Sequence, residues 1–242
     1  MSTGLPASGP ASAVRHQPAK GQNIFYALFL VLSPLLSLGV NIYAFSDFRN
    51  VSHDGGHRYG LLSYFSGLSG AVLSFILILL GVNIFFALLR RHYRVRSLLL
   101  LFGIFSSFYL ALDLCVVAYG IFAFNVQSVA LLLVSVSIYM SLNIVFLFWY
   151  WYLDYPDQVI HRHRPEHPVQ ISFPARPSID RGGWVPGMLD YVYLTVMISN
   201  TLGPPENHSA VGDRVKMLQL IHSTTMLMLL VVVVSRAINI AS

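Results

Sequence analysis

Long apolar runs separated by short polar segments dominate this chain. Five such runs occupy residues 24–44, 61–89, 97–124, 128–153 and 216–239. Each is about as long as the roughly 20 mostly apolar residues that a helix needs to cross about 30 Å of hydrocarbon. The pattern therefore predicts five membrane-spanning helices.

A sixth run, residues 184–202, is shorter and less uniform. Pro186, Gly187 and Asp190 lie near its start, and a helix over the whole run would cover only about 28 Å. Two interpretations follow from this length. The run is either a sixth span or a hairpin that dips into the membrane and returns.

Lys and Arg residues are distributed unevenly when the runs are threaded alternately through a membrane. With six spans and a cytoplasmic N-terminus, eleven of the fifteen lie inside: Arg15, Lys20, Arg90, Arg91, Arg94, Arg96, Arg162, Arg164, Arg176, Arg181 and Arg236. The four outside are Arg49, Arg58, Arg214 and Lys216. Cytoplasmic loops of membrane proteins carry such an excess. We therefore expect a multi-pass membrane protein with its N-terminus in the cytoplasm.

The hairpin interpretation contains two topologies that the charges rank differently. A hairpin entering from outside would leave three Lys and Arg residues inside and twelve outside, which the usual charge distribution disfavours. A hairpin entering from inside, with the C-terminus outside, keeps twelve inside. That second topology stays open.

The expected fold class is an all-α bundle of six transmembrane spans, with five spans plus a re-entrant hairpin as the alternative. Residues 1–23, rich in Pro, Ser, Gly and Ala, are expected to form a disordered cytoplasmic tail. Residues 24–153 are expected to form a four-helix transmembrane region and residues 154–183 a polar cytoplasmic loop. Residues 184–242 are expected to form a helix-turn-helix or pore-like module.

Composition and charge exclude several other classes. With 55% apolar and 10% charged residues, the chain has too little polar surface for a soluble domain. A net charge of +5 fits loops that face anionic lipid, and no basic stripe points to nucleic acid. The single Cys115 rules out an internal disulfide. No metal site or catalytic motif stands out, so we expect a non-enzymatic protein without a cofactor.

Aromatic residues crowd the inner end of the fourth span, over residues 146–152. Amphipathic rings settle at the headgroup level of a bilayer. These residues are therefore predicted to form an interface belt.

Polar side chains at membrane depth are the candidate functional residues. Asp113 lies 17 residues into its apolar run, Asn143 on the next span, His222 about two turns into the last one, and Asp190 near the start of residues 184–202. A carboxylate near the bilayer centre costs about 2.5 to 3.5 kcal/mol unless it faces partners or water. Asp113 is then either a cation or proton relay or an interhelical anchor. His222 is expected to bond a neighbouring carbonyl.

The C-terminal segment resembles the pore region of potassium-channel-like proteins. The resemblance rests on DYVYLTVM at residues 190–197, SNTLGPPE at residues 199–206, and VGDR at residues 211–214 ahead of the last apolar run. In that family, an aromatic-rich pore helix precedes a Thr-Val-Gly-Tyr-Gly-Asp filter and a Gly-Arg-led inner helix. The resemblance implies that the carbonyls of Thr201, Leu202 and Gly203 face an ion and that Glu206 takes the place of the acidic residue.

Two positions depart from the filter pattern. Pro204 and Pro205 stand where the family has Tyr and the second Gly, and proline fixes φ near −65°, which is incompatible with the filter backbone. Residues 201–206 are therefore either a degenerate filter or an outer turn in which the prolines end a helix.

A broader resemblance links the C-terminal half to an uncharacterised bacterial family of predicted multi-pass membrane proteins with a domain of unknown function. The shared features are Tyr152-Leu153-Asp154, Phe173-Pro174, Asp190-x-x-Tyr193 and His222 ahead of the last helix. This resemblance implies a multi-pass protein of a bacterial inner (plasma) membrane and brings no activity with it.

Three function classes remain at this point. The first expectation is an oligomeric channel for monovalent cations, whose path includes Glu206, Asp113 and Asn143, together with Asp190, His222 and the Thr201 to Gly203 segment. The alternative is a non-catalytic membrane scaffold or accessory subunit that docks through its cytoplasmic loops. An intramembrane enzyme ranks last, because no set of catalytic residues converges at one depth.

Overall fold

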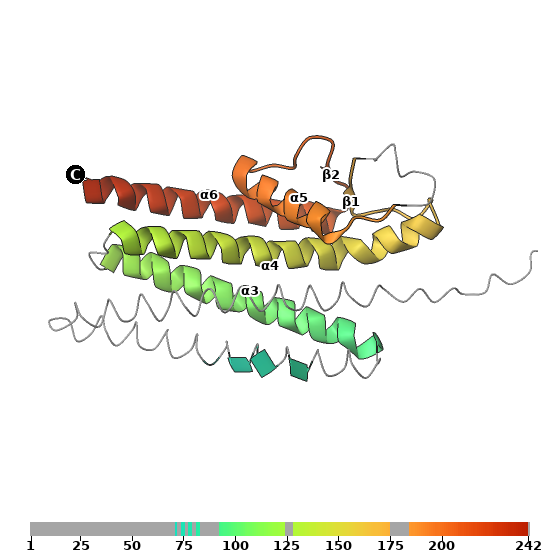
Figure 1. The fold of residues 1–242 in the computed structure, drawn as a ribbon, viewed down its shortest axis with the longest axis horizontal. Helices are drawn as coiled ribbons and strands as arrows, with labels where there is room; N and C mark the ends of the chain where they lie inside the picture. The colour runs from blue at the N-terminus through green and yellow to red at the C-terminus, as the bar shows by residue number, and fades with distance from the viewer. Residues whose placement is uncertain are drawn as a thin grey trace, which may run out of the picture.

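A computed structural model of the chain describes residues 92–123, 128–174 and 184–241, together with seven isolated positions between 71 and 82. The described part is mostly helical and contains four helices (Figure 1). In chain order the elements are α3 (His92–Ala123), α4 (Ser128–His163), β1 (Ile171–Ser172), α5 (Met188–Thr201), β2 (Ser209–Ala210) and α6 (Asp213–Ala241). The expected tail, residues 1–23, and the first predicted span, residues 24–44, lie outside the described residues.

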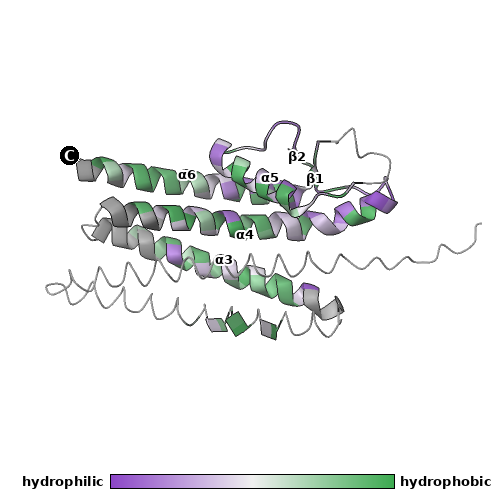
Figure 2. Cartoon of the chain, in the orientation of Figure 1, coloured by the Kyte–Doolittle hydropathy of each residue, from purple (hydrophilic) through white to green (hydrophobic). Residues whose placement is uncertain are grey.

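Helix α4 is the centre of the described bundle. It packs against α3, α5 and α6, and it runs antiparallel to α3 and α6, its long neighbours (Figure 1). Hydrophobic residues occupy much of the coloured length of these helices (Figure 2). A helix satisfies its own backbone hydrogen bonds, which is why apolar runs of this length form helices in lipid.

Three of the described helices are long and apolar enough to cross a membrane. The candidate spans are Arg96–Cys115, Ser135–His163 and Asp213–Ser235. They define the protein as a helical membrane protein, which confirms the coarser part of the predicted fold class. Of the five runs predicted as certain spans, the last three therefore correspond to described helices.

The described residues do not show residues 184–202 as a sixth span. Helix α5 has 14 residues and is only about 21 Å long, too short to cross the hydrocarbon. Strand β1 pairs with β2 in antiparallel register, Ile171 opposite Ala210. The chain therefore enters and leaves the α5 segment at the same end of the bundle. This is the arrangement of the re-entrant alternative.

A correction concerns the expected polar loop, residues 154–183. Helix α4 continues to His163 with Pro156 inside it, so the first part of this loop is helical. Pro156 removes one backbone hydrogen bond without ending the helix, which the sequence pattern did not indicate. Figure 2 shows hydrophilic residues gathered at this end of α4. We call the end of the bundle that holds the C-terminus of α4, the β1–β2 pair and the N-terminus of α6 the polar end.

The aromatic residues of α4 form core rather than only an interface belt. Phe146, Phe148, Tyr150 and Trp151 are all buried. The ring of Phe148 stacks on Tyr152, with centroids 5.6 Å apart. Their burial between neighbouring helices explains why α4 is the most enclosed of the candidate spans. The predicted belt was therefore wrong for these four side chains.

Candidate functional site

The boundary of the apolar region can be placed along α4. Polar residues begin at Asp154, and the guanidinium of Arg96 lies 5.5 Å from the ring centre of Tyr152. Arginine and tyrosine favour the membrane interface. Tyr139 lies thirteen residues before Tyr152, which is roughly 20 Å deeper along the helix.

Asp190 stabilises the start of α5. The backbone N–H of Gly187 donates to Asp190 Oδ2 at 2.8 Å. A carboxylate in the first turn satisfies an otherwise unpaired N–H and favours the positive end of the helix dipole. The structure thus gives Asp190 a capping role at the polar end, away from the depth expected for an ion path.

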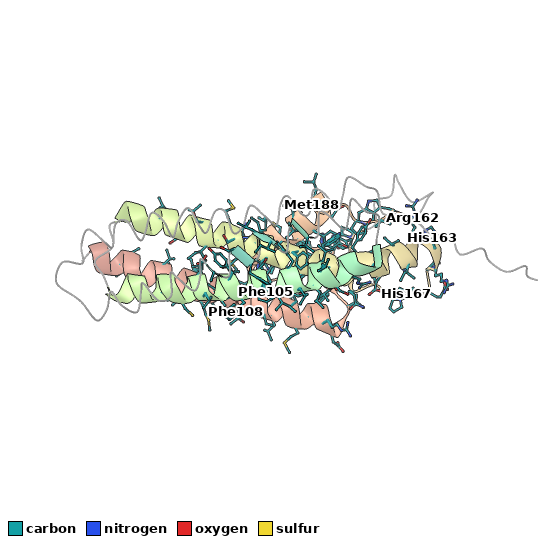
Figure 3. The ribbon with its side chains drawn as sticks, turned by 90° about the horizontal axis from the view of Figure 1, so that it is seen from below. Phe105, Phe108, Arg162, His163, His167 and Met188 are labelled. Atoms are coloured by element: carbon teal, nitrogen blue, oxygen red, sulfur yellow. The ribbon has the colours of Figure 1, made fainter. Side chains whose placement is uncertain are left out.

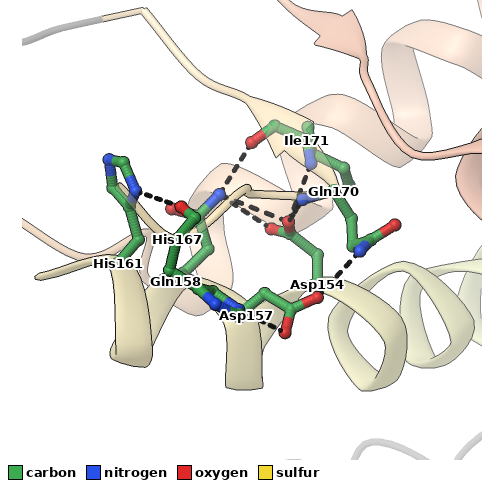
Figure 4. Close-up of polar contacts among 7 residues, drawn as sticks. All are labelled: Asp154, Asp157, Gln158, His161, His167, Gln170 and Ile171. Atoms are coloured by element: carbon green, nitrogen blue, oxygen red, sulfur yellow. Dashed lines mark hydrogen bonds and ion pairs between the residues drawn. The ribbon is translucent and has the colours of Figure 1, made fainter. Parts of the chain in front are cut away.

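Asp154 forms a buried carboxylate centre that joins α4, β1 and α5 (Figure 4). Its Oδ1 accepts hydrogen bonds from the backbone N–H groups of Gln170, at 3.1 Å, and Ile171, at 2.8 Å. Its Oδ2 accepts from the Tyr191 hydroxyl at 2.7 Å, and Gln158 Nε2 donates to both oxygens. Gln158 also donates to the Ile171 carbonyl at 2.7 Å. These bonds occupy the carboxylate, so Asp154 holds α5 and β1 to α4.

A half-buried histidine pair, His161 and His167, borders this centre (Figure 4). His167 Nε2 lies 3.1 Å from Asp157 Oδ1, and His161 Nδ1 lies 2.6 Å from the His167 carbonyl. Gln170 Nε2 donates to the other Asp157 oxygen at 2.8 Å. Within the described ranges, no three His, Cys, Asp or Glu side chains form a group that could hold a metal ion. These contacts fold the segment after α4 back onto the helix.

A continuous chain of buried polar groups crosses the bundle at membrane depth. Tyr150 Oη lies 3.3 Å from His222 Nδ1, and Ser199 Oγ lies 2.9 Å from His222 Nε2. Ser199 Oγ donates to Asn143 Oδ1 at 2.8 Å, and Asn143 Nδ2 donates to the Tyr139 carbonyl at 2.8 Å. The chain connects α4, α5 and α6 through one hydroxyl group, that of Ser199.

The direction of these hydrogen bonds determines the form of His222. The Asn143 amide nitrogen donates to a carbonyl, so its oxygen faces Ser199 and takes the single Ser199 proton. His222 Nε2 must then carry a proton and donate to Ser199. When the imidazole is neutral, Nδ1 has no proton and accepts from the Tyr150 hydroxyl. The ring of Phe146 stacks on the imidazole, with centroids 4.0 Å apart at 15°.

Two of the predicted ion-path residues meet in this chain, and the others lie elsewhere. Asn143 and His222 are joined through Ser199. Asp113 is buried on α3, and Asp190 caps α5. His222 bonds side chains rather than the expected carbonyl.

Sequence reasoning missed Ser199 as the junction residue. Tyr191, Thr195 and Ser199 are spaced four residues apart in α5, and all three are buried. Three polar residues at helical spacing in a short apolar segment form a stripe that must face protein. That spacing could have identified the buried face of α5.

The Thr201 to Glu206 segment forms the end of α5 and the following turn. Leu202 caps the helix in the left-handed conformation, φ 57°, and its N–H donates to the Ile198 carbonyl. Thr201 Oγ1 lies 2.7 Å from the Met197 carbonyl and 2.9 Å from the Gly203 carbonyl. This is the geometry of a helix C-terminus, which agrees with the turn interpretation. That the segment acts as an ion filter stays a prediction.

The C-terminal end of α5 lies far from the polar end. The Tyr139 hydroxyl donates to Asn200 Oδ1 at 2.8 Å, and Ser199 bonds His222 nine residues into α6. The segment after α5 then returns to β2, which pairs with β1 at the polar end. Glu206 lies on this returning segment and is exposed on the surface of the chain.

Comparisons with known protein families, curated proteins and solved structures found no match to this chain. The three long apolar helices of its described part place it among helical membrane proteins.

Proposed function

We propose that this protein forms a permeation pathway for small cations. The observation that carries the proposal is the path of the chain between α4 and α6: a short helix reaches membrane depth, turns at residues 202–208, and returns to the end from which it started. Non-helical backbone at membrane depth is tolerated only where it is buried in protein or lines water. Pore helices followed by a returning segment are a way in which channels build such a path.

Electrostatics favours a cation at the end of α5. The C-terminal end of a helix carries a partial negative charge from its unpaired carbonyls. In α5 this end points into the membrane region, because Ser199 and Asn200 make the deep contacts with His222 and Tyr139. The exposed Glu206 adds a full negative charge on the segment that returns from this end to β2. Both groups attract cations and repel anions.

The proposed topology has five spans and a hairpin that enters from the cytoplasm. It places Arg214 and Lys216 inside with the other cytoplasmic charges, so that twelve of the fifteen Lys and Arg residues lie on that side. In a bacterial inner membrane, the N-terminus then lies on the cytoplasmic side and the C-terminus on the outer side. This arrangement satisfies both the charge distribution and the short α5.

The proposed pathway selects cations weakly. Selective potassium filters need several successive backbone carbonyls aimed at the ion. Here Pro204 and Pro205 restrict the backbone, and the Gly203 carbonyl faces the Thr201 hydroxyl at 2.9 Å. Discrimination between potassium and sodium is therefore expected to be small, with charge selection by Glu206 dominating.

The test is cation flux into liposomes that contain the purified protein. We expect uptake of both potassium and sodium, and we expect Glu206→Gln to reduce it several-fold because the carboxylate that concentrates cations is lost. Glu166→Gln is the matched control. Glu166 is also an exposed glutamate, but it lies after α4 at the polar end, and its loss should leave flux unchanged.

A membrane scaffold or accessory subunit is the second candidate. The observation that favours it is that the buried polar side chains hydrogen-bond to one another, as a structural contact between helices would. These side chains are Tyr150, His222, Ser199 and Asn143. Liposomes that stay tight to potassium, sodium and protons under an imposed gradient would contradict the channel and leave this candidate.

A further inference from the structure

Two aspartates one turn apart on α4 hold the hairpin that carries α5. Gln170 connects them, because its backbone N–H donates to Asp154 Oδ1 at 3.1 Å and its side chain donates to Asp157 Oδ2 at 2.8 Å. The Gln170 carbonyl in turn accepts from the backbone N–H groups of Val211, at 2.8 Å, and Gly212, at 3.1 Å. The start of α6 is therefore fixed to α4 through this one residue.

Asp154 holds the other parts of the hairpin. Its side chain is fully buried. It accepts from the Ile171 N–H, which belongs to β1, and from the Tyr191 hydroxyl, which belongs to α5. Strand β1 holds β2 in turn. One buried carboxylate thus joins α4 to every described element of the hairpin, directly or through one neighbour.

All the groups that bond Asp154 are neutral donors. They are two backbone N–H groups, the Gln158 amide and the Tyr191 hydroxyl. No Lys or Arg of the described ranges forms an ion pair with Asp154. A proton on the carboxylate would turn one acceptor into a donor that faces other donors, so a buried N–H or O–H would lose its partner. This set of bonds therefore requires an ionised Asp154.

Burial without a partner cation makes this charge sensitive to acid, because charged groups in such a position tend to neutralise. The neighbouring pair, Asp157 and His167, responds in the opposite sense. A proton on His167 strengthens its attraction to the carboxylate 3.1 Å away. Figure 3 shows His167 at the same end of the bundle as Arg162 and His163. Acid therefore weakens the hold on the hairpin at Asp154 and not at Asp157.

Other titratable or charged side chains lie on each element around Asp154. They are Arg96 on α3, His161 on α4, Asp190 and Tyr191 on α5, His208 before β2, and Asp213, Arg214 and Lys216 on α6. Of these described groups, only Tyr191 bonds Asp154. His208 contacts the ring of Phe173, with centroids 5.4 Å apart, and Lys216 lies 3.2 Å from Asp213. None of them supplies a positive charge to the buried carboxylate.

We infer that Asp154 is an acid-sensitive latch: protonation of its carboxyl group releases β1 and the start of α5 from α4. The far end of α5 stays in place, because Ser199 remains bonded to His222 and Asn143. The hairpin then opens at the polar end alone. This inference goes beyond the proposed function, since the latch works whether or not cations pass through the protein.

The distance between two spin labels tests the latch. The labels are attached through Ile160→Cys, near the end of α4, and Leu189→Cys, at the start of α5, in a Cys115→Ser background. Both positions are exposed, by 41% and 81%. In nanodiscs, we expect one short distance at about pH 8 and a reversible second, longer distance at about pH 5. Distances that stay the same over this range, with Asp154 intact, would overturn the inference.

Asp154→Asn tests which group responds. Asparagine keeps the size of the side chain, but its amide nitrogen cannot accept a hydrogen bond, so we expect the longer distance at both pH values. Asp157→Asn is the matched control. It loses the pair with His167 but leaves Asp154 in place, and it should keep the pH response. A short distance in Asp154→Asn at either pH, or loss of the response in Asp157→Asn, would assign the release to another group and overturn the latch.

Cation flux separates the latch from the proposed function. A distance that changes with pH, in protein whose liposomes stay tight to potassium and sodium, would keep the latch and end the channel. Flux through protein whose label distance does not change with pH would keep the channel and end the latch.

Discussion

Ser199 is the residue on which the buried polar chain depends. Its hydroxyl donates to Asn143 and accepts from His222, and these bonds link α5 to both of its neighbours. A serine has only one proton to donate, so the whole chain has a single direction. The orientation of the Asn143 amide and the single Ser199 proton together require that His222 Nε2 is the donor to Ser199.

Ser199→Ala is predicted to destabilise the protein by about 2 kcal/mol. The substitution leaves the Asn143 oxygen and the His222 N–H buried without a partner, and each such group costs about 1 to 3 kcal/mol. Thermal unfolding in detergent measures the effect. Ser209→Ala is the control, since Ser209 is an exposed serine whose loss should change stability by less than about 0.5 kcal/mol. Equal melting of the two variants would contradict the role given to Ser199.

At the scale of elements, close packing of α3 on α4 depends on a small residue. A Cβ atom added at Gly103 would overlap the buried ring of Phe148. Trp149 Nε1 donates to Ser107 Oγ at 2.8 Å one turn further along α3. The two helices can therefore approach closely here only because residue 103 has no side chain, as is common between membrane helices.

Gly103→Ala is predicted to destabilise the α3–α4 contact by about 1 to 3 kcal/mol, because overpacking forces the Phe148 ring or the helix to move. Gly81→Ala is the matched control, since a Cβ atom there meets nothing within 4 Å. In a helix that change is expected to be neutral or slightly stabilising. Unfolding in detergent with increasing denaturant compares the two. A Gly103→Ala variant as stable as the original chain would show that the helices are less closely packed than described.

At the scale of the whole molecule, the β1–β2 pair is the contact that favours the proposed five-span topology. Two residue pairs hold the segment after α4 against the segment before α6, and Asp154 binds the same region to α4 and α5. With both ends of the hairpin fixed at one end of the bundle, α4 and α6 must be consecutive spans of opposite direction. The polar end then faces a single compartment.

Lys216→Cys in a Cys115→Ser background is predicted to react with a membrane-impermeant thiol reagent only in inside-out vesicles. Lys216 is exposed at the start of α6, which is cytoplasmic in the five-span topology and external in the six-span one. Glu166→Cys, cytoplasmic in both, is the control for vesicle orientation. Labelling of Lys216→Cys in intact cells would restore the six-span topology.

The apolar pattern alone was sufficient for the class of protein and for the spans of α3, α4 and α6, because a run of about 20 apolar residues has no stable alternative to a helix in lipid. It was also sufficient to single out Asn143 and His222 as polar residues inside the apolar runs, since polar groups at membrane depth are costly and therefore rare. It could not decide between a span and a hairpin for residues 184–202. The length of this run suits either a short span or a hairpin. Strands β1 and β2 have two residues each, which is too short for a recognisable alternation of polar and apolar residues.

Only the tertiary structure showed which polar groups meet and which residues bring the chain back. The sequence predicted Asp190 as an ion-path residue at membrane depth, whereas in the fold its carboxylate caps the start of α5. Ser199 and Asp154 gain their roles from partners 23 and 37 residues away, and no local pattern specifies such contacts. Hydropathy depends on each residue alone and so determines what enters the membrane, whereas hydrogen bonds depend on pairs and are decided only when the helices pack.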